Sequence, residues 1–569
     1  MEYKSETRKC QNCNNDFTIE PDDFLFYKKI KVPAPTFCPE CRLIRRFLWR
    51  NEGNLYKNNC KLCNKNIITT SSSNNKFPIY CHDCWWGDKW DAVDYGGNYD
   101  FSIPFFEQFK KLIEKTPNLN LWATENINSE YANYTGYSKN AYLSVVIKCE
   151  NIFYSRVLEK SKDCMDSYWV LDSELCYENF NTSKIYNSSF LNNCRDCINS
   201  RFLFSCRNCQ NCFMCSNLRN KSFCIRNEQY SKEDYLKELE YYNLSSFISL
   251  EKYKKEFIDL IKNSIHEFAE ITNSVNSIGD NITNSKNAIQ CFMAEGENIK
   301  YCWRETGNIK DSYDIAGGLY NELIYESSLS ADNNYFVKFF SHAKGNKNSE
   351  FIYLCVNCSN CFACIGLRNK QYCILNKQYT KEQYEELVPK IIKHMNDMPY
   401  IDSKGRIYKY GEFFPSELSP FCYNETIAQE YFPLTKEEAL KQGYKWKDKE
   451  ERNYNIDIYN NDIPDNINDV HDDITNKIIE CNHKDCNHQC TEAFKIILEE
   501  LQFYRRMNLP LPHLCPNCRH YERLSQRNPL KLWHRKCMKE GCANEFETSY
   551  SPDRPEIIYC EKCYQQEVY

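Results

Sequence analysis

Short clusters of aromatic and aliphatic residues, each followed by Ser or Asn, recur about once every dozen residues or slightly fewer through the centre of the chain. Between Glu150 and Ser205 the segments ENIFYSRVLEKS, KDCMDSYWVLDS, ELCYENFNTS, KIYNSSFLNN and CRDCINSRFLFS align, and looser copies run from Gln290 to Ser328. A period this short suits one strand and turn per step and is too short for helical hairpins. The pattern predicts a β-solenoid with Asn and Ser in turns or ladders and Cys, Phe, Tyr and Ile in a narrow core.

The repeat pattern is itself duplicated, because residues 206–235 return at 355–384 with an offset of 149. Both copies carry CxxCxxCxxC followed by LRNK. This spacing approaches that of an iron–sulfur protein, but no proline follows a fourth ligand. Cysteines can also pack a solenoid core as small hydrophobic residues, or bind additional zinc. We expect core packing, with both kinds of metal site left open, for Cys206, Cys209, Cys212, Cys215, Cys355, Cys358, Cys361 and Cys364.

Helical patterns separate the two repeat blocks. Ser231 and Thr380 each precede an acidic first turn just after a block, which predicts capped helices that shield its last rung. Ser249 precedes an apolar stripe that runs from Leu250 to Ile261. This stripe predicts a packing helix between the blocks.

Cysteine pairs at both ends of the chain form the second duplication. Many residues of the two ends match at an offset of 477, among them Cys13 with Cys490 and Cys38 with Cys515. Two thiolates on a tight turn can bind one ion, and a second turn completes a tetrahedral zinc site. Four protein ligands leave no position for water, so such sites are structural.

Pairing the cysteines in order predicts four zinc ribbons and therefore about four structural zinc ions. At the third site, Cys481, His483 or His488 can replace one ligand, because the spacing there is wider. The four predicted ligand sets are Cys10, Cys13, Cys38 and Cys41; Cys60, Cys63, Cys81 and Cys84; Cys486, Cys490, Cys515 and Cys518; and Cys537, Cys542, Cys560 and Cys563.

Arginines follow the first ribbon of each module. Arg42, Arg46 and Arg50 are four residues apart, so on a helix they form one cationic face that suits a phosphate backbone or an acidic protein. Trp49 and Trp533 could stack on bases. The alternative is a solvated linker helix. The candidate nucleic-acid contacts are Arg42, Arg45, Arg46, Arg50, Arg519, Arg523 and Arg527.

Composition limits the class of protein. The 569 residues carry a net charge of −6, which argues against a uniformly cationic nucleic-acid coat. No apolar run approaches the length of a membrane span, and the start MEYKSETRKC lacks a signal-peptide pattern. In a protein without a secretion signal, 35 cysteines point to metal binding or packing rather than disulfides. We therefore expect a cytoplasmic protein without membrane contact.

The predicted architecture is mainly β with helical linkers: terminal double zinc-ribbon modules flank a duplicated short-rung β-solenoid. An Asn-rich stretch with six aspartates and one proline separates the second module. The expected order is a double zinc-ribbon module (1–95), a helical linker (96–139), the first repeat block (140–230), a helical spacer (231–279), the second repeat block (280–379), a capping helix and connector (380–452), an acidic linker (453–476) and a second double zinc-ribbon module (477–569).

The whole chain resembles an uncharacterised family of cysteine-rich proteins with zinc ribbons at both ends, met chiefly in small uncultivated bacteria. The resemblance implies zinc binding and no particular activity. Members of that family are richer in Cys along the solenoid, where this chain often has Ser, Asn or Tyr. The resemblance rests on CPECRLIRRFLWRNEGNLY (38–56), CHDCWWGDKWD (81–91), the two LRNK blocks, AQEYFPLTKEEAL (428–440) and SPDRPEIIYCEKCY (551–564).

These patterns favour a zinc-binding scaffold or adaptor that contacts nucleic acid or a nucleoprotein complex through its arginines. The alternative is a scaffold for proteins only, bound along the solenoid, and a third possibility is a redox protein that uses the central cysteines. The sequence contains no phosphate-binding loop, hydrolase elbow or HExxH motif. An enzyme is therefore the less favoured class.

Overall fold

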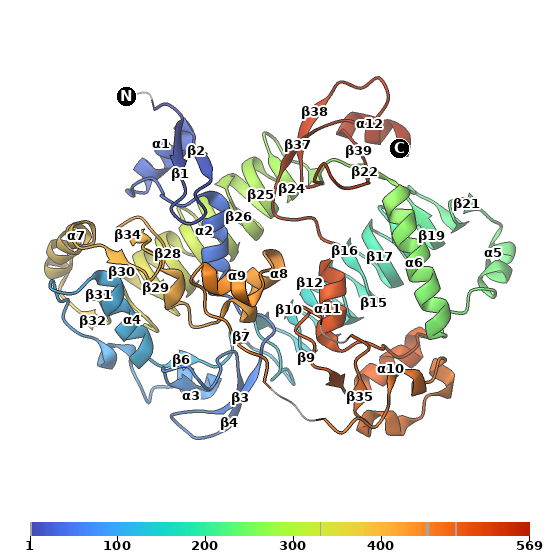
Figure 1. Ribbon diagram of the computed structural model, residues 1–569, viewed down its shortest axis with the longest axis horizontal. Coiled ribbons are helices and arrows are strands. Elements are labelled where there is room, and N and C mark those ends of the chain that lie inside the picture. The colour runs from blue at the N-terminus through green and yellow to red at the C-terminus, as the bar shows by residue number, and fades with distance from the viewer. Residues whose placement is uncertain (1–2, 331, 451–453, 484–485) are drawn as a thin grey trace.

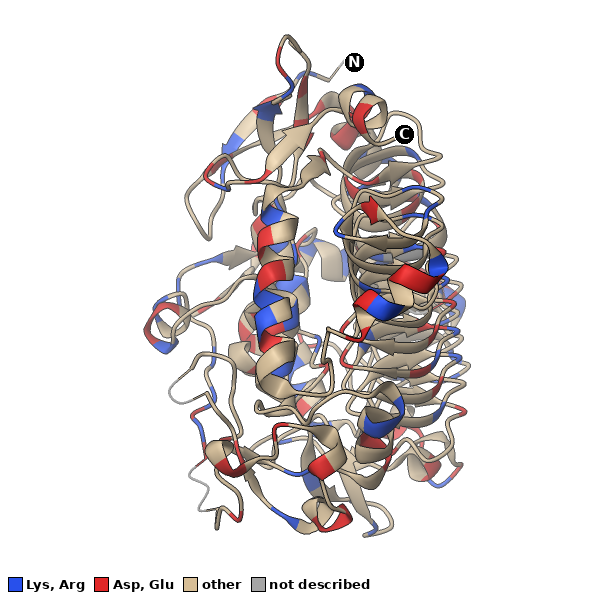
Figure 2. Cartoon of the chain, turned by 90° about the vertical axis from the view of Figure 1, so that its right-hand side faces the viewer, with Lys and Arg blue, Asp and Glu red and all other residues tan. Residues whose placement is uncertain are grey.

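The computed structural model describes residues 3–330, 332–450, 454–483 and 486–569. Two blocks of stacked coils form one layer, and most helices and both modules form a second layer over one face of it (Figure 2). The predicted class, mainly β with a duplicated short-rung solenoid, is confirmed. Both chain termini lie on the same side of the molecule (Figure 1).

The first block is a 15-stranded sheet whose strands are parallel except for the last pair. Its strands are β7 (Ala123–Thr124), β8 (Thr135–Gly136), β9 (Lys139–Tyr142), β10 (Val145–Ile147), β11 (Glu150–Phe153), β12 (Arg156–Glu159), β13 (Lys162–Met165), β14 (Tyr168–Leu171), β15 (Glu174–Tyr177), β16 (Phe180–Ser183), β17 (Tyr186–Arg195), β18 (Arg201–Phe204), β19 (Gln210–Ser216), β20 (Ser222–Ile225) and β21 (Glu228–Gln229). The second block is a 10-stranded sheet of the same kind. Its strands are β23 (Ile271–Thr272), β24 (Ile278–Thr283), β25 (Lys286–Lys300), β26 (Trp303–Gly318), β27 (Tyr325–Ser330), β28 (Tyr335–Ala343), β29 (Lys347–Tyr353), β30 (Ser359–Phe362), β31 (Gln371–Ile374) and β32 (Lys377–Gln378).

The N-terminal module is followed by a helix and a short strand that lead into the first block. The elements are β1 (Glu6–Lys9), β2 (Asp16–Ile19), α1 (Pro21–Lys29), α2 (Pro39–Phe47), β3 (Tyr56–Asn59), β4 (Asn66–Thr69), β5 (Ile79–Tyr80), α3 (His82–Trp86) and η1 (Ala92–Tyr95), then α4 (Phe105–Lys115) and β6 (Asn118–Leu119). Between the blocks lie α5 (Lys232–Leu239), α6 (Phe247–Asn263) and β22 (Ile265–Glu267).

After the second block the chain forms a connector and then the C-terminal module. The connector contains α7 (Lys381–Asp397), β33 (Tyr400–Ile401), β34 (Ile407–Tyr408), η2 (Ser416–Leu418), η3 (Tyr423–Glu425), α8 (Ile427–Tyr431), α9 (Lys436–Lys441), η4 (Asn460–Asp462), η5 (Ile467–Asp469) and η6 (Asp472–Asn476). The module contains β35 (Ile479–Glu480), β36 (Ala493–Phe494), α10 (Leu498–Met507), α11 (Pro516–Leu524), β37 (Trp533–Lys536), β38 (Glu545–Thr548), β39 (Ile557–Tyr559) and α12 (Glu561–Val568).

Each coil of the first block is a four-sided turn. Tyr168 pairs with Phe180, and Phe180 pairs with Asn192, so equivalent residues of successive coils are a dozen positions apart. From Lys160 to Arg226 every third residue has a positive φ, which divides each coil into sides of three residues. Asn and Asp tolerate this left-handed conformation best among residues with a side chain, which accounts for their frequency here. The coil thus has more corners than the single strand and turn that its period predicts.

The inward side chains of each coil hold the next coil through hydrogen bonds. Ser161 Oγ donates to the carbonyl of Glu159 at 2.9 Å and accepts the amide of Ser173, one coil further, at 3.2 Å. Cys194 Sγ makes the same two contacts, donating to the carbonyl of Asn192 and accepting the amide of Cys206, both at 3.4 Å. Cysteine therefore serves in this core as serine does. The eight central cysteines of the two CxxCxxCxxC segments are all buried in the cores of the coils.

Asparagines at the corners form ladders between coils, as the sequence predicts. Asn187 Nδ2 donates to Asn199 Oδ1 at 2.9 Å, and Asn208 Nδ2 donates to Asn220 Oδ1 at 2.7 Å. Both pairs are one coil apart. The ladders satisfy side-chain amides that a left-handed corner directs outward.

The helices begin close to their predicted starts. Thr380 caps α7 by accepting the amide of Gln383. The helix between the blocks begins earlier than expected, because Ser246 caps α6 by accepting the amide of Ser249. In the part of the chain that the structure describes, no helix is both long and apolar enough to span a membrane.

The segment predicted as an acidic linker packs against the C-terminal module. Ile467 and Ile474 are buried in the same core cluster as Leu501 and Tyr504 of that module. Residues 451–453, where the predicted connector ends and the linker begins, lie outside the described residues. From residue 454 onward, this stretch is therefore part of the folded C-terminal half.

Candidate metal centres

Three of the four predicted cysteine sets come together as predicted. In each set the four sulfur atoms lie within 4.8 Å of one another. One pair of each set sits in the turn of a two-stranded hairpin, and the other begins a helix, as Cys38 does for α2 and Cys81 for α3. The three sets are Cys10, Cys13, Cys38 and Cys41; Cys60, Cys63, Cys81 and Cys84; and Cys537, Cys542, Cys560 and Cys563.

Distances between the sulfur atoms fit a tetrahedral ion. Four sulfurs at about 2.3 Å from a zinc ion lie about 3.8 Å from one another, because the edge of a tetrahedron is about 1.6 times the distance from its centre to a corner. The sulfurs of Cys13 and Cys38 are 3.8 Å apart, and those of Cys63 and Cys81 are also 3.8 Å apart. The sulfur of Cys542 lies 3.9 Å from that of Cys560. All of these separations match a metal tetrahedron and far exceed a disulfide bond.

Backbone and side-chain amides favour the thiolate form that binds metal. Burial raises the pKa of Cys60, but hydrogen bonds from the amides of Cys81 and Cys63 outweigh this effect and lower the pKa to about 6. The Cys81 amide donates to Cys60 Sγ at 3.3 Å. Burial likewise raises the pKa of Cys560, and the Asn544 side chain, 3.4 Å away, and the amide of Cys563 bring its pKa to about 7. Hydrogen bonds from amide groups therefore favour the thiolate form, which binds metal, at these two sulfurs.

The third set differs from the prediction in one ligand. Cys481, not Cys486, joins Cys490, Cys515 and Cys518 in a group of four buried sulfurs. The amide of Cys515 donates to Cys481 Sγ at 3.2 Å, just as the Cys81 amide does in the second set. The Cys481 sulfur lies 3.8 Å from that of Cys518. From the sequence, Cys481 is expected only as a substitute ligand, because it stands outside the CxxxC spacing. Cys486 lies in a second, overlapping group that contains His483 and His488.

The predicted cationic face of the arginine helices is inside the protein, so this expectation is wrong. Arg42, Arg45, Arg46, Arg50, Arg519 and Arg523 are all buried, and Arg527 is partly buried. Trp49, expected to stack on bases, is fully buried too. The period of four residues in these helices marks a face turned toward the solenoid. As the chain is folded, a phosphate backbone cannot reach these six guanidinium groups.

The arginines of α2 bind carboxylates of the second block. Arg42 and Arg46 each reach Asp314 at 2.9 Å, and Arg45 reaches Glu326 at 2.8 Å. These carboxylates belong to β26 and β27, and both strands contact α2. Figure 1 shows β26 beside α2. The N-terminal module therefore docks on the block that is farther from it in the sequence.

The arginines of α11 repeat this docking on the first block. Asp166 accepts Arg519 at 3.0 Å and Arg523 at 2.7 Å. The aromatic contacts are repeated as well. The rings of Tyr177 and Tyr504 meet edge to face with their centres 5.9 Å apart. In the N-terminal half, the rings of Tyr27 and Tyr325 meet in the same way at 5.6 Å. We call this arrangement crossed docking, because each module binds the block that adjoins the other module in the sequence.

The LRNK motifs take part in the same crossed docking. Arg219 Nη2 donates to the hydroxyl of Tyr564, next to the last ligand of the fourth cysteine set, at 3.1 Å. Arg368, its counterpart in the second block, donates to the carbonyls of Gly87 and Trp90 at 3.2 Å. Each motif thus holds the second ribbon of a module against the end of a block. The sequence shows the repeated motif but not this contact.

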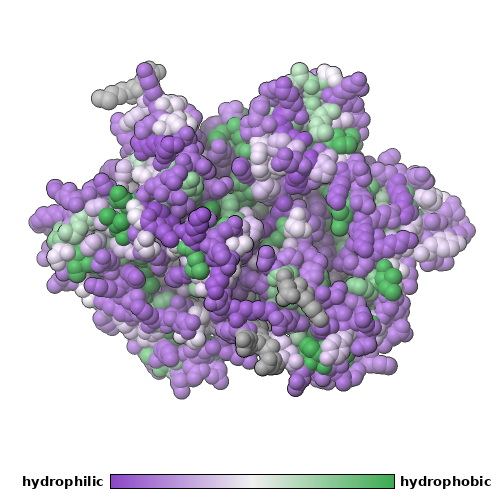
Figure 3. Space-filling model, viewed as in Figure 1, coloured by the Kyte–Doolittle hydropathy of each residue, from purple (hydrophilic) through white to green (hydrophobic). Residues whose placement is uncertain are grey.

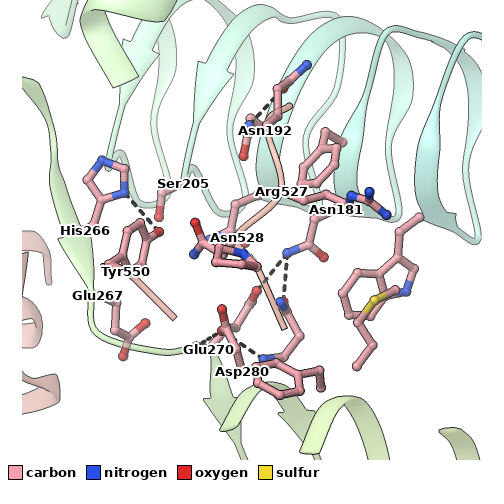
Figure 4. A pocket seen from close by; sticks show the side chains of 18 of the residues that line it. Asn181, Asn192, Ser205, His266, Glu267, Glu270, Asp280, Arg527, Asn528 and Tyr550 are labelled. Atoms are coloured by element: carbon pink, nitrogen blue, oxygen red, sulfur yellow. Dashed lines mark hydrogen bonds between the residues drawn. The ribbon is translucent and has the colours of Figure 1, made fainter. Parts of the chain in front are cut away.

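A small polar cavity of about 140 Å³ lies where the two blocks meet. Asn181 Nδ2 donates to Glu270 at 3.1 Å and to Asn281 at 2.9 Å, which links the first block to the start of the second (Figure 4). Burial, reinforced by the nearby Glu270, raises the pKa of Glu267 to about 7. Burial also raises the pKa of Asp280. Hydrogen bonds between the polar side chains that line the cavity therefore connect the two blocks.

Comparisons with protein-family models and with curated proteins give no match for this chain. The resemblance to a family of cysteine-rich proteins with terminal zinc ribbons therefore stays a prediction.

Proposed function

We propose that the protein is a zinc-stabilised scaffold that binds another protein along the outer side of its two solenoid blocks. Four groups of four cysteine sulfurs supply closed tetrahedral sites, and thiolate ligands in that number favour zinc. Closed sites make the ions structural. A reducing compartment such as the cytoplasm would keep these thiols available for metal.

One observation carries the choice of partner: the two blocks present the same exposed column of side chains. In both, successive coils place an aliphatic residue, Lys, Glu, Lys, Glu and Tyr next to one another. The columns are Ile127, Lys139, Glu150, Lys162, Glu174 and Tyr186 in the first block and Val275, Lys286, Glu297, Lys310, Glu322 and Tyr335 in the second. All twelve side chains are exposed or partly exposed.

The chemistry of these columns suits a protein rather than a nucleic acid. Lys139 lies 3.4 Å from Glu150, and Lys286 lies 3.4 Å from Glu297, so charges of both signs alternate along each column. Figure 2 shows acidic and basic residues interspersed along the outer edge of the coils. A phosphate backbone requires a predominantly cationic surface, whereas an extended protein segment of alternating charge complements such a column.

The layer of modules and helices supports this choice of side. On the face that Figure 3 shows, hydrophilic residues predominate and apolar residues gather only in small, separate patches. Modules and helices already occupy that face of the solenoid.

A crosslinking experiment tests the proposal. A photoreactive phenylalanine analogue would replace Tyr186 or Tyr335, the matching ends of the two columns, in the full-length protein. Tyr241, a strongly exposed tyrosine outside the columns, is the matched control position. We expect both column positions, and not the control, to crosslink to the same protein in cells. Crosslinks to RNA or DNA at the column positions, or equal crosslinking at all three, would contradict the proposal.

A further inference from the structure

A second group of metal-binding side chains adjoins the third cysteine set. The ligand atoms of His483, Cys486, His488 and Cys518 all lie within 4.8 Å of one another. The sulfur of Cys486 is 3.7 Å from that of Cys518, again the edge expected of a metal tetrahedron. Two imidazoles and two thiolates are an ordinary ligand set for structural zinc.

Both histidines hold an unsatisfied nitrogen in this group. The Nδ1 atoms of His483 and His488 are buried, and within the described residues neither has a hydrogen-bond partner. A buried polar atom without a partner destabilises the fold unless a ligand occupies the site. The other nitrogen of His483, Nε2, faces the Glu522 carboxylate at 3.8 Å, as the second nitrogen of a metal-bound imidazole often does. The His488 ring stacks on Tyr521 at 5.3 Å, which fixes its orientation.

Cys518 belongs to both groups. Its sulfur lies 3.8 Å from Cys481 in the first group and 3.7 Å from Cys486 in the second. A thiolate sulfur has enough lone pairs to bind two ions at once. With Cys518 shared, each ion has four protein ligands. A second divalent cation also reduces the negative charge that four buried thiolates leave around a single ion.

The N-terminal module has a shorter turn at this point. There β1 ends at Lys9 and β2 begins at Asp16, so the turn consists of residues 10–15. In the C-terminal module β35 ends at Glu480 and β36 begins at Ala493, so the turn consists of residues 481–492 and has room for the two histidines and Cys486. The N-terminal module therefore serves as an internal comparison with a single-ion first ribbon.

We propose that the C-terminal module holds a two-metal centre in which the Cys518 thiolate bridges a zinc ion bound by Cys481, Cys490 and Cys515 and a second zinc ion bound by His483, Cys486 and His488. The chain would then bind five zinc ions instead of four. This inference rests on the proposed zinc scaffold only for the identity of the metal.

Metal counting separates the two proposals. Elemental analysis of the full-length protein, purified without oxygen, is expected to give five zinc ions per chain. The variant His483→Ala/His488→Ala should lose one ion and keep four, while the exposed control His534→Ala should keep five. Four ions in both the wild type and the double variant would overturn the two-metal centre and leave the zinc scaffold intact. Absence of bound metal would overturn both.

Cadmium replacement supplies a second measurement that needs no variant. In ¹¹³Cd NMR spectra of the cadmium-loaded wild-type protein, two ions that share a sulfur couple to each other. We expect one mutually coupled pair of signals among five. Five or fewer signals without a coupled pair would contradict a bridging Cys518.

Discussion

Buried arginines show how single residues hold the modules in place. Asp166 is fully buried and pairs with two guanidinium groups, those of Arg519 and Arg523, and Glu500 also pairs with Arg519. A buried ion pair adds little stability over an apolar pair, but removing one partner leaves an uncompensated charge and costs about 3–5 kcal/mol. The arginines therefore make docking specific, because a surface without a matching carboxylate would leave their charges uncompensated.

Replacing Asp166 by Asn tests this role. The amide keeps the shape and tolerates the left-handed backbone of Asp166, whose φ is 51°, but it removes the charge. We expect a loss of about 3–5 kcal/mol in the free energy of unfolding, measured by chemical denaturation. Asp172→Asn is the matched control, since this exposed aspartate has a φ of 48°. Its variant should change stability by less than about 0.5 kcal/mol. Equal losses in the two variants would argue against the ion pairs.

The burial of these arginines could not be predicted from the sequence. A spacing of four residues places Arg42 and Arg46 on one helical face, but it does not say what that face contacts. Their partner Asp314 is 272 residues from Arg42 in the chain. The cysteine ligands were predictable because each pair is local. Cys481 was missed as the principal ligand because it is separated from Cys490 by eight residues.

The solenoid coil is the element on which the rest of the fold is built. Its sequence period was visible, but the division of each coil into four sides was not. The reason is chemical: the inward positions alternate among residues such as Cys164, Ser167 and Val170, so no hydrophobic period of three appears. What these residues share is small size and, for Ser and Cys, the ability to bond a carbonyl of their own coil and an amide of the next coil.

A pair of substitutions at Cys194 tests whether hydrogen bonding or packing decides the inward residue. Cys194→Ser keeps a group that donates to Asn192 and accepts the amide of Cys206, whereas Cys194→Val fills a similar volume without either bond. Leaving a buried amide unpaired costs about 1–3 kcal/mol. We therefore expect the Val variant to be less stable than the Ser variant by about this amount, as measured from urea unfolding curves. The reverse order would show that apolar volume decides this position.

At the scale of the whole molecule, crossed docking joins the two ends of the chain into one structure. The two modules carry equivalent helices, α2 and α11, and the two blocks carry equivalent carboxylates. From sequence alone either module fits either block, so the pairing could not be predicted. The structure places each module against the block that is not its neighbour in the chain.

Deleting the C-terminal module, residues 477–569, distinguishes crossed docking from docking on the adjacent block. We expect amide hydrogen exchange to become faster in the first block, around Asp166 and Tyr177, because their partners are removed. The second block should keep its protection, since α2 still covers it. Loss of protection chiefly in the second block would contradict the crossed arrangement.

Crossed docking also orders events during synthesis of the chain. Asp314 follows Arg46 by 268 residues, so it leaves the ribosome much later. At typical rates of translation this is a delay of roughly 15 to 50 s. During that time the N-terminal module has its cysteine ligands but no block to dock on, and the arginines that it will bury remain in water. The C-terminal module, in contrast, emerges when its block has already been synthesised, so Arg519 and Arg523 have their partner Asp166 available at once.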